Sequence, residues 1–595
     1  MAFQVSPGVQ VNEIDLTNVV PAVPTSIGGF AGAFSWGPSE EIVSVSSEKE
    51  LANTFGSPND ETAKAFLTAA SFLKYGKELK VARVINTANA LNATSGDGVD
   101  YGLLIKNRSH YEDTHAGGTA ERGFWGAKCP GSLGNSLRVE VCSSVTAFEA
   151  TDVRTETNPL TGVTESVTYS DWKYAGEFDS APGTSTYAAK YGATNDELHI
   201  VVIDEDGLFT GVKGTVLEKF AGVSQASDAV KIDGTTNFYK NVINTESKYI
   251  WWLSSFTAAS AGVLSNAGQS ASAGAPGGGP LAFDTETIII GNSLQAGNNG
   301  TTPTTDQISA GLEIFADADT VDLNLLFSVN DTNGTNTIAQ KLAAIANRRK
   351  DVVAFLSPPT EDTVGTTTPA ADVKNWADTI TSTSYAVIDS TALKVYDKYN
   401  DVYRWIPAAG HIAGLCANTD DVADAWFSPA GFNRGQLLGV TKLAFNPKQT
   451  ERDTLYKARV NPIVSFPGQG TILYGDKTAQ SKPSAFDRIN VRRLFITLEK
   501  AIATAAKYQL FEFNDEFTRA MFRNMVEPFL REVQGRRGLT DFAVICDETN
   551  NTGDVIDRNE FRADIYIKPA RSINFITLNF IATRTGVDFS ELVGK

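Results

Sequence analysis

The sequence has few of the residues that build metal centres and covalent cross-links. Only 4 cysteines and 4 histidines occur among its 595 residues. The cysteines form no CxxC pair and the histidines no HExxH spacing, which argues against a structural zinc site, a disulfide framework and a zinc hydrolase. The GxSxG signature of serine hydrolases is missing too. We therefore expect no metal, no cofactor and no catalytic residue.

Long apolar runs are also missing. None approaches the ~18 residues of a membrane-spanning helix, and the N-terminus lacks the basic and apolar regions of a secretory signal. Hydrophobic residues make up 42% of the chain and charged residues 20%, close to the globular norm. We expect a soluble protein of about three to five domains, made in a reducing compartment and not inserted directly into a membrane.

Positive charge is in deficit. Lys and Arg number 51 against 69 Asp and Glu, for a net charge of −18. A chain this acidic repels phosphates, so nucleic acid is not an expected partner. Residues 449–595 are nevertheless balanced, with 21 basic and 19 acidic side chains. Two arginine clusters in this region are interleaved with acids, which favours a protein–protein surface over a solvated face. They are Arg488, Arg492 and Arg493, and Arg531, Arg536 and Arg537.

Two segments match ligand-binding loops only in part. Residues 470–478 lack the lysine that a phosphate loop needs directly after its second glycine, because Asp476 intervenes. Residues 547–554 resemble a calcium loop: with Glu548 as position one, Gly553 is in the sixth place, but the twelfth place holds Asn559 instead of glutamate. Both patterns predict ordinary polar turns.

An extended segment opens the chain. Residues 9–14 alternate like a short strand, and the prolines of residues 19–24 favour extended backbone. No turn signal pairs this strand with the next one. It must find a sheet elsewhere, either in its own chain or, by strand addition, in another.

The middle of the chain has the rhythm of an α/β core with an insertion. Strand, helix and strand patterns occupy residues 25–34, 61–75 and 79–85, and the alternation returns near residue 305. Its later strands are expected at 321–329, 352–356, 385–388 and 402–406, and its later helices at 337–349 and 371–379. Between these parts, Thr, Ser, Gly, Asn and Asp dominate, with short β-like runs such as residues 198–203.

The last part is the most regular. Asn490 is expected to cap a first helix, and a second helix begins near Asp515, with Pro528 inside it and Gly535 or Gly538 at its end. Three strands are expected after these helices. They are a buried strand at 542–546, an alternating one at 561–568, and one that is apolar on both faces at 573–582.

The expected fold class is α/β (mixed α+β) and multidomain, with a discontinuous α/β core, a β-rich peripheral insertion and extended strand arms at both ends. The divisions are a 1–24 arm pairing with a neighbouring subunit, a core of 25–88 plus 305–448, an insertion of 89–304, and a C-terminal α/β domain of 449–595 with the strand 573–582.

Several short segments resemble one protein family. They are residues 6–9, 12–13, 34–38, 53–58, 396–402, 412–417, 428–435, 473–478, 486–495, 555–561 and 569–580. Together they resemble the contractile tail sheath protein of myovirus-type bacteriophages, close to the T-even-like branch. The resemblance covers residues 1–88 and 390–595, whereas residues 89–304 match poorly, as expected of surface-exposed domains that vary in the family.

The resemblance implies a virion structural protein without enzymatic activity. Copies would form hexameric rings around the tail tube, and the rings would stack helically from the baseplate. The implied partners are further copies of the chain, the tail tube protein, baseplate proteins and a tail terminator. The sheath would contract and drive the tube through the host envelope for genome ejection, without nucleotide hydrolysis. The protein would be made in the host bacterial cytoplasm and reside in the phage tail sheath.

Two groups of residues are the expected contact sites. The strand-exchange residues are Val9, Val11, Ile14, Ile573, Phe575, Ile576, Leu578 and Phe580. The possible tube-facing surface consists of Glu512, Asp515, Glu516, Arg519 and Arg523, with an ordinary solvent-facing helix as the rival interpretation. The alternative functions are a static coat or adhesion protein with a glycan-binding β-rich domain, and an enzyme of the α/β type.

Overall fold

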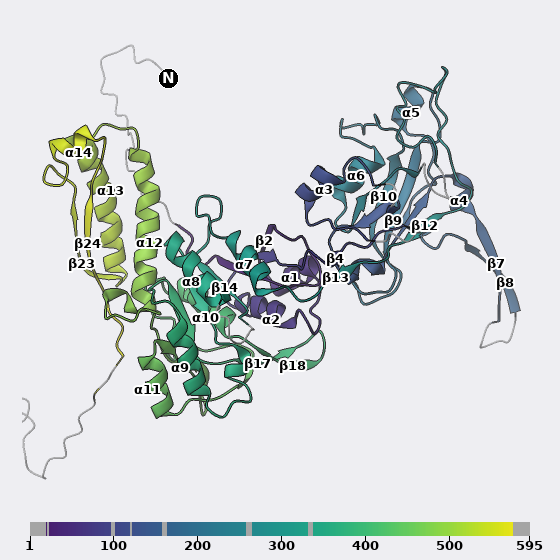
Figure 1. The fold of residues 1–595 in the computed structure, drawn as a ribbon. Helices are drawn as coiled ribbons and strands as arrows, with labels where there is room; N and C mark the ends of the chain where they lie inside the picture. The colour runs from purple at the N-terminus through teal and green to yellow at the C-terminus, as the bar shows by residue number, and fades with distance from the viewer. Residues whose placement is uncertain are drawn as a thin grey trace, which may run out of the picture.

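The computed structural model describes residues 20, 23–96, 102–119, 122–157, 164–256, 264–330, 337–574 and 577. Figure 1 shows that they form an elongated molecule with three parts in a row. A central α/β part carries the largest sheet. A β-rich part lies on one side of it, and a layer of two long helices and a small sheet lies on the other.

The central sheet has seven strands in the order β2-β3-β1-β14-β15-β16-β20. Every neighbouring pair is parallel except β2 and β3. From β1 the chain adds strands in one direction, and from β14 in the other, so the sheet is doubly wound. The strands are β1 (Gly28–Gly32), β2 (Ile42–Val45), β3 (Leu79–Arg83), β14 (Leu325–Ser328), β15 (Val353–Leu356), β16 (Ala386–Asp389) and β20 (Val460–Asn461).

Helices cover both faces of this sheet. α1 (Glu48–Phe55), α2 (Ala63–Phe72) and α10 (Ala409–Val422) contribute to the core on one face. α7 (Thr305–Glu313), α8 (Thr337–Arg349), α9 (Pro369–Thr379) and α11 (Gln449–Lys457) contribute to the core on the other. α2 and α10 cross closely because α10 has a glycine at the contact: a Cβ on Gly410 would lie 2.2 Å from the Thr68 carbonyl oxygen.

The α/β rhythm expected from the sequence is confirmed, and one expected boundary is wrong. α8 has the expected bounds, and so does β18 (Val402–Ile406), which forms a small sheet with β17 (Leu393–Asp397) and β19 (Val440–Leu443). The core sheet, however, continues past residue 448, because β20 pairs with β16. The hairpin of β21 (Ile463–Phe466) and β22 (Gly470–Leu473) follows, with Ile463 and Leu473 in the same core.

The β-rich part has an antiparallel sheet in the order β10-β9-β6-β12 and a core of its own. At its base, β4 (Ala90–Leu91) pairs with β13 (Asn298–Asn299). Its other elements are β5 (Trp125–Ala127), β6 (Leu137–Cys142), β7 (Thr151–Thr157), β8 (Thr164–Ser170), β9 (Glu197–Asp204), β10 (Thr215–Ser224), β11 (Ile250–Trp252), β12 (Ile290–Ser293), α3 (Arg108–Thr114), α4 (Val145–Glu149), α5 (Thr186–Lys190) and α6 (Tyr239–Glu246).

A buried arginine fastens the β-rich part to the core. Arg83, at the end of β3, is 2% exposed. Its guanidinium donates to the carbonyl oxygens of Phe34 (3.0 Å) and Gly37 (2.6 Å) and, across to the β-rich part, to that of Pro130 (2.8 Å). Three carbonyl acceptors satisfy a charge that would otherwise be costly to bury.

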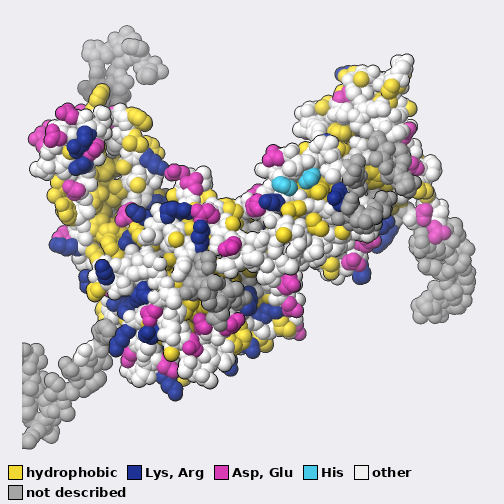
Figure 2. Space-filling view, viewed as in Figure 1, with side chains coloured by type: hydrophobic (Ala, Val, Ile, Leu, Met, Phe, Trp, Pro, Cys, Tyr) yellow, Lys and Arg dark blue, Asp and Glu magenta, His cyan; other side chains and the backbone are white. Residues whose placement is uncertain are grey.

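The third part consists of α12 (Ile489–Ala506), α13 (Glu516–Gly535), β23 (Leu539–Ile545), α14 (Gly553–Asp557) and β24 (Asp564–Pro569). Figure 2 shows hydrophobic side chains gathered over α12 and α13. α13 begins next to Asp515, as expected, and Asp515 caps it; its last residue is Gly535, one of the two expected ends. The expected cap of α12 is wrong, because Arg488 holds that position and Asn490 lies buried in the first turn.

A buried carboxyl in the core should make stability depend on pH. Asp389, at the end of β16, is 1% exposed, and burial raises its pKa to about 8 despite hydrogen bonds from Ser357 and Thr391. The folded state therefore favours the protonated acid. The stability that this protonation contributes is fully present below the unfolded pKa of ~3.9 and is lost as pH rises through about 8.

Asp389→Asn should remove this dependence, because the amide cannot ionise. Relative to the parent protein, the variant should gain melting temperature between pH 6 and pH 9. Thermal unfolding of both proteins across this range is the measurement. Curves that run parallel would show that Asp389 is already ionised in the folded state at pH 6, and that burial does not raise its pKa into this range.

Candidate assembly site: two anchored chain ends beside an open sheet

Both ends of the described chain are fastened to the body of the subunit. Near the N-terminus, Val20 is 8% exposed and belongs to the apolar core of α12 and α13, and Val23 packs against the same core. Next to them, the Thr25 carbonyl oxygen accepts a hydrogen bond from Arg493 of α12 at 3.2 Å. The base of the N-terminal segment is therefore fixed on α12.

Arg493 also joins α12 to α10. Its two terminal nitrogens lie 2.8 and 2.6 Å from the carboxylate oxygens of Asp420, and it donates to the Cys416 carbonyl oxygen at 3.1 Å. The side chains of Arg493 and Asp420 are 4% and 7% exposed. Burial disfavours the positive charge of Arg493. The attraction of the Asp420 carboxylate is stronger than this effect, and it holds the pKa of Arg493 above its ordinary value.

The arginine cluster at the start of α12 is thus not the protein–protein surface expected from the sequence. Arg492 is 5% exposed, donates to Ser384 at 2.9 Å and lies over the rings of Tyr385 and Phe486. Arg488, described next, is engaged within the subunit as well. These charges are buried because they attach the third part to the core.

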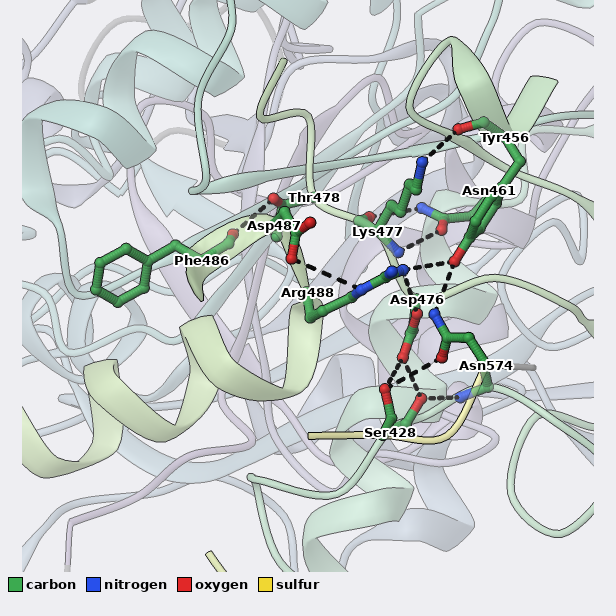
Figure 3. Close-up of polar contacts among 12 residues, drawn as sticks. Ser428, Tyr456, Asn461, Asp476, Lys477, Thr478, Phe486, Asp487, Arg488 and Asn574 are labelled. Atoms are coloured by element: carbon green, nitrogen blue, oxygen red, sulfur yellow. Dashed lines mark hydrogen bonds and ion pairs between the residues drawn. The ribbon is translucent and has the colours of Figure 1, made fainter. Parts of the chain in front are cut away.

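The C-terminal segment is held by a group of polar residues that we call the C-terminal anchor. It consists of Asp476, Arg488, Tyr456 and Asn574, which are labelled in Figure 3, and of Ser572. Asp476 is 4% exposed and accepts from Arg488 at 3.1 Å and from the Ser572 hydroxyl at 2.8 Å. With its amide oxygen turned toward Arg488, Asn574 accepts two guanidinium hydrogen bonds at 2.9 and 3.0 Å. The Tyr456 hydroxyl lies 3.2 Å from the same amide.

Electrostatics keep the anchor charged. Partial burial opposes the charge of Arg488, but Asp476 and Tyr456 hold its pKa above the ordinary value. Burial lowers the pKa of Lys477, whose ammonium donates to the Tyr456 carbonyl oxygen at 2.7 Å. Residues 470–478 form β22 and a following segment in which Lys477 bridges to Arg488, where the sequence predicted a turn, and the lysine of this segment is engaged internally.

The anchor predicts how firmly the C-terminal segment is held. A variant with Ser572→Ala and Asn574→Ala loses three hydrogen bonds to charged groups. We expect the C-terminal segment to detach from the anchor about 30-fold more often, which corresponds to a loss of ~2 kcal/mol in the free energy that holds it. Trypsin should then cleave after Arg571 correspondingly faster, as timed by mass spectrometry. Thr577→Ala, at an exposed position beyond the anchor, is the control. An unchanged cleavage rate in the double variant would show that the anchor does not hold the segment.

The third part also contains a sheet of two antiparallel strands, β23 and β24, and β24 ends at Pro569, shortly before the C-terminal anchor. Phe542, Val544 and Ile565 pack on the α12–α13 core, whereas Tyr566 on the other face is 59% exposed. Within the described residues neither outer edge of this sheet is paired. The expectation of a buried strand at 542–546 is wrong, because this small sheet leaves one face of β23 in solvent.

Most of the expected strand-exchange residues lie outside the described residues. These are Val9, Val11, Ile14, Phe575, Ile576, Leu578 and Phe580. Ile573 is described and lies between the two anchor residues of the C-terminal segment, with its side chain 82% exposed. An exposed isoleucine at this point is an apolar side chain without cover in the single subunit.

The expected tube-facing residues divide into two kinds. Glu512, Asp515 and Glu516 are exposed, and the hydrogen bonds of Thr518 lower the pKa of Asp515, the cap of α13. Arg519 is 6% exposed and donates to the Asn514 side chain at 2.9 Å, so its expected place on an outer surface is wrong. Arg523 is half-buried.

Sequence reasoning missed two features of this region. The C-terminal anchor was not expected, although three segments named for the family resemblance, at 473–478, 486–495 and 569–580, supply most of it. The loop between α12 and α13 was not singled out, although five large apolar residues fall within residues 508–517. These residues do not follow the spacing of a helical stripe, and this could have indicated that they lie outside a helix core.

The fold and the anchored ends define a structural protein built for assembly, and comparisons with known proteins agree. Three family descriptions match the chain: phage tail sheath C-terminal domain at residues 481–583, phage tail sheath protein central domain at 301–479, and tail sheath protein Gp18 domain III N-terminal region at 25–84. The tail sheath proteins of Vibrio phage KVP40 and Enterobacteria phage T4 are each 34% identical, over 99% of this chain and 99% of theirs.

A solved structure shares the fold. It is a sheath tail protein from Listeria innocua, 11% identical, with 92% of this chain and 96% of that chain aligned at a TM-score of 0.51. The chain belongs to the phage tail sheath protein family. It is a structural component of the virion and a subunit of a contractile tail sheath.

Proposed function

We propose that copies of this chain form hexameric rings that stack helically around a tail tube, from the baseplate to a tail terminator. The observation that carries this is a two-stranded sheet whose outer edges are unpaired among the described residues, on a subunit that holds both of its chain ends at their bases. Strands added to its outer edges from neighbouring copies would link subunits through backbone hydrogen bonds. Each such bond contributes about 0.5–1.5 kcal/mol, and apolar side chains add to it.

The added strands are those around Val9, Val11 and Ile14, and those around Ile573, Phe575, Ile576, Leu578 and Phe580. Because each segment is held at its base, a strand joined to a neighbour stays attached to the body of its own subunit. Domains can then rotate as rigid bodies about persistent links while the sheath shortens and widens. Contraction drives the tube through the host envelope.

The energy for contraction is stored in the assembly. The extended sheath is metastable, the contracted sheath has more favourable contacts, and a kinetic barrier separates them until the baseplate triggers release. No nucleotide is hydrolysed and no residue is catalytic.

The protein is made in the host bacterial cytoplasm. The third part of the molecule faces the tube, and the exposed carboxylates of Glu512, Asp515 and Glu516 contribute to that face.

Contraction without fuel is the test. Sheaths assembled on tail tubes in nucleotide-free buffer should shorten when a mild denaturant lowers the barrier, and electron micrographs should show two lengths. Added ATP should change neither the lengths nor the rate. Sheaths of a single length would favour a static coat, and contraction only with ATP would contradict the metastable mechanism.

A further inference from the structure

The loop between α12 and α13, together with the first turn of α13, exposes an unusual amount of apolar surface. Tyr508, Leu510, Phe511, Phe513 and Phe517 are 73%, 63%, 105%, 84% and 72% exposed. We call this group the aromatic knob. Phe511 is held at φ +72°, a left-handed conformation that bulky side chains rarely adopt. Soluble monomers seldom expose clustered apolar side chains on this scale, which marks the knob as an interaction site.

A second aromatic surface lies on the core. Phe432, Phe466 and Tyr474 form a triangle with ring centroids 5.3 to 6.2 Å apart. Phe432 and Tyr474 are 51% and 45% exposed. We call this trio the aromatic platform. Rings at such separations form a continuous surface on which further aromatic side chains can pack.

The knob and the platform lie at opposite ends of α12. The platform is at the beginning of the helix, because the Ile489 amide donates to the carbonyl oxygen of Asp476, two residues after Tyr474. The knob directly follows the last residue of α12, which runs away from the core in Figure 1. Its 18 residues span ~27 Å, so the two surfaces cannot meet within one subunit.

The charges around the two surfaces are complementary. Glu512, Asp515 and Glu516 border the knob and are exposed, with Lys507 as an opposing charge. At the platform, the Arg452 guanidinium lies 6.0 Å from the Tyr474 ring centroid. An acidic aromatic surface and a basic one attract each other and repel their own kind.

We propose that the knob of one copy of this chain docks on the platform of the next copy. The contact is heterologous, because each copy presents both surfaces and a bound pair still has one of each free. Such contacts continue from copy to copy and suit a stack of rings. This inference rests on the self-assembly proposed above and adds a second set of contacting surfaces, separate from the exchanged strands. It gives Glu512, Asp515 and Glu516 a neighbouring copy as their contact, where the proposed function places them against the tube, and the cross-link described next decides between the two.

Cross-linking tests the contact directly. One full-length variant carries Phe513→Cys and another Phe432→Cys, and the two are assembled together and treated with a short bismaleimide. The four natural cysteines are free and buried, so they compete little. We expect cross-linked dimers from the mixture, and a ladder of higher oligomers from a chain that carries both substitutions. Ile232→Cys, 99% exposed on the β-rich part, paired with Phe432→Cys is the control and should give none.

A charge exchange provides an independent readout. Arg452→Glu should lower the cross-linking yield about tenfold, and adding Glu516→Arg should restore much of it. Assembled tubes without a link between positions 513 and 432 would overturn the docking proposal and leave strand exchange standing. Links between two copies of Phe513→Cys alone would overturn its heterologous character. Failure to assemble at all, in the parent protein as well, would instead contradict the proposed function.

Discussion

Replacing Val11 by proline is expected to abolish polymerisation and leave a soluble, folded monomer. Proline has no N–H to donate, so one ladder bond is lost and its ring disturbs the strand. Every subunit of a sheath would carry the same defect, so a cost of a few kcal/mol at each link should raise the concentration needed for assembly more than 100-fold. Sedimentation and electron microscopy of the purified variant measure this.

Two matched variants make the result specific. Val11→Ala keeps the N–H and should assemble, with only a modest loss from reduced apolar contact. Ile576→Pro applies the same test to the C-terminal strand. All three proteins should have the circular dichroism spectrum and melting temperature of the parent, because the arms contribute to neighbours rather than to their own subunit. Normal tubes from both proline variants would exclude strand exchange through these residues.

Replacing Arg493 by methionine should cause the largest loss of stability in the single chain. The substitution leaves the Asp420 carboxylate 7% exposed without its partner and removes the donor to Thr25. Breaking a buried ion pair by removing one member costs about 3–5 kcal/mol. Urea unfolding should show this loss, and the N-terminal segment should become more sensitive to proteases because its base is released.

A double variant separates the charge from the packing. With Asp420→Leu added, no unpaired charge remains buried, and most of the lost stability should return. The protease sensitivity of the N-terminal segment should persist, because the hydrogen bond to Thr25 is still missing. If the free energy of unfolding of Arg493→Met lies within 1 kcal/mol of that of the parent, Arg493 does not join the third part to the core.

The α/β core was predictable because its signals are local. α8 carries a complete amphipathic pattern, and the strands around it are short apolar runs that are buried on both faces, as parallel strands usually are. The capping aspartate and terminal glycine of α13 are equally local signals. Elements of this kind need no knowledge of distant residues.

Other features depend on contacts that the sequence does not display. α12 begins at Ile489 because its amide reaches the carbonyl oxygen of Asp476, so a capping side chain at Asn490 is not required. The exposure of β23 follows from a sheet with only one other strand among the described residues, which an apolar run cannot reveal. The core boundary lies beyond residue 448 because β20, a strand of only two residues, pairs with β16.

In the candidate site, too, some features follow from local sequence and others depend on distant contacts. The exposure of the acids Glu512, Asp515 and Glu516 agrees with their place at the start of α13. Arg519, in contrast, turns inward and donates to Asn514, a contact that charge patterns do not specify. The C-terminal anchor brings together Tyr456, Asp476 and Asn574, which lie up to 118 residues apart. Buried polar groups of this kind are dictated by tertiary structure, because each polar atom needs a partner of suitable geometry.

Negative-stain electron microscopy of the purified chain, alone and after tail tubes are added, tests the central claim most directly. The account predicts hollow tubes with a helical surface lattice from the chain alone, and sheathed tubes in two lengths when tail tubes are present. A monodisperse monomer under every condition would contradict assembly through exchanged strands, and with it the sheath formed by this chain.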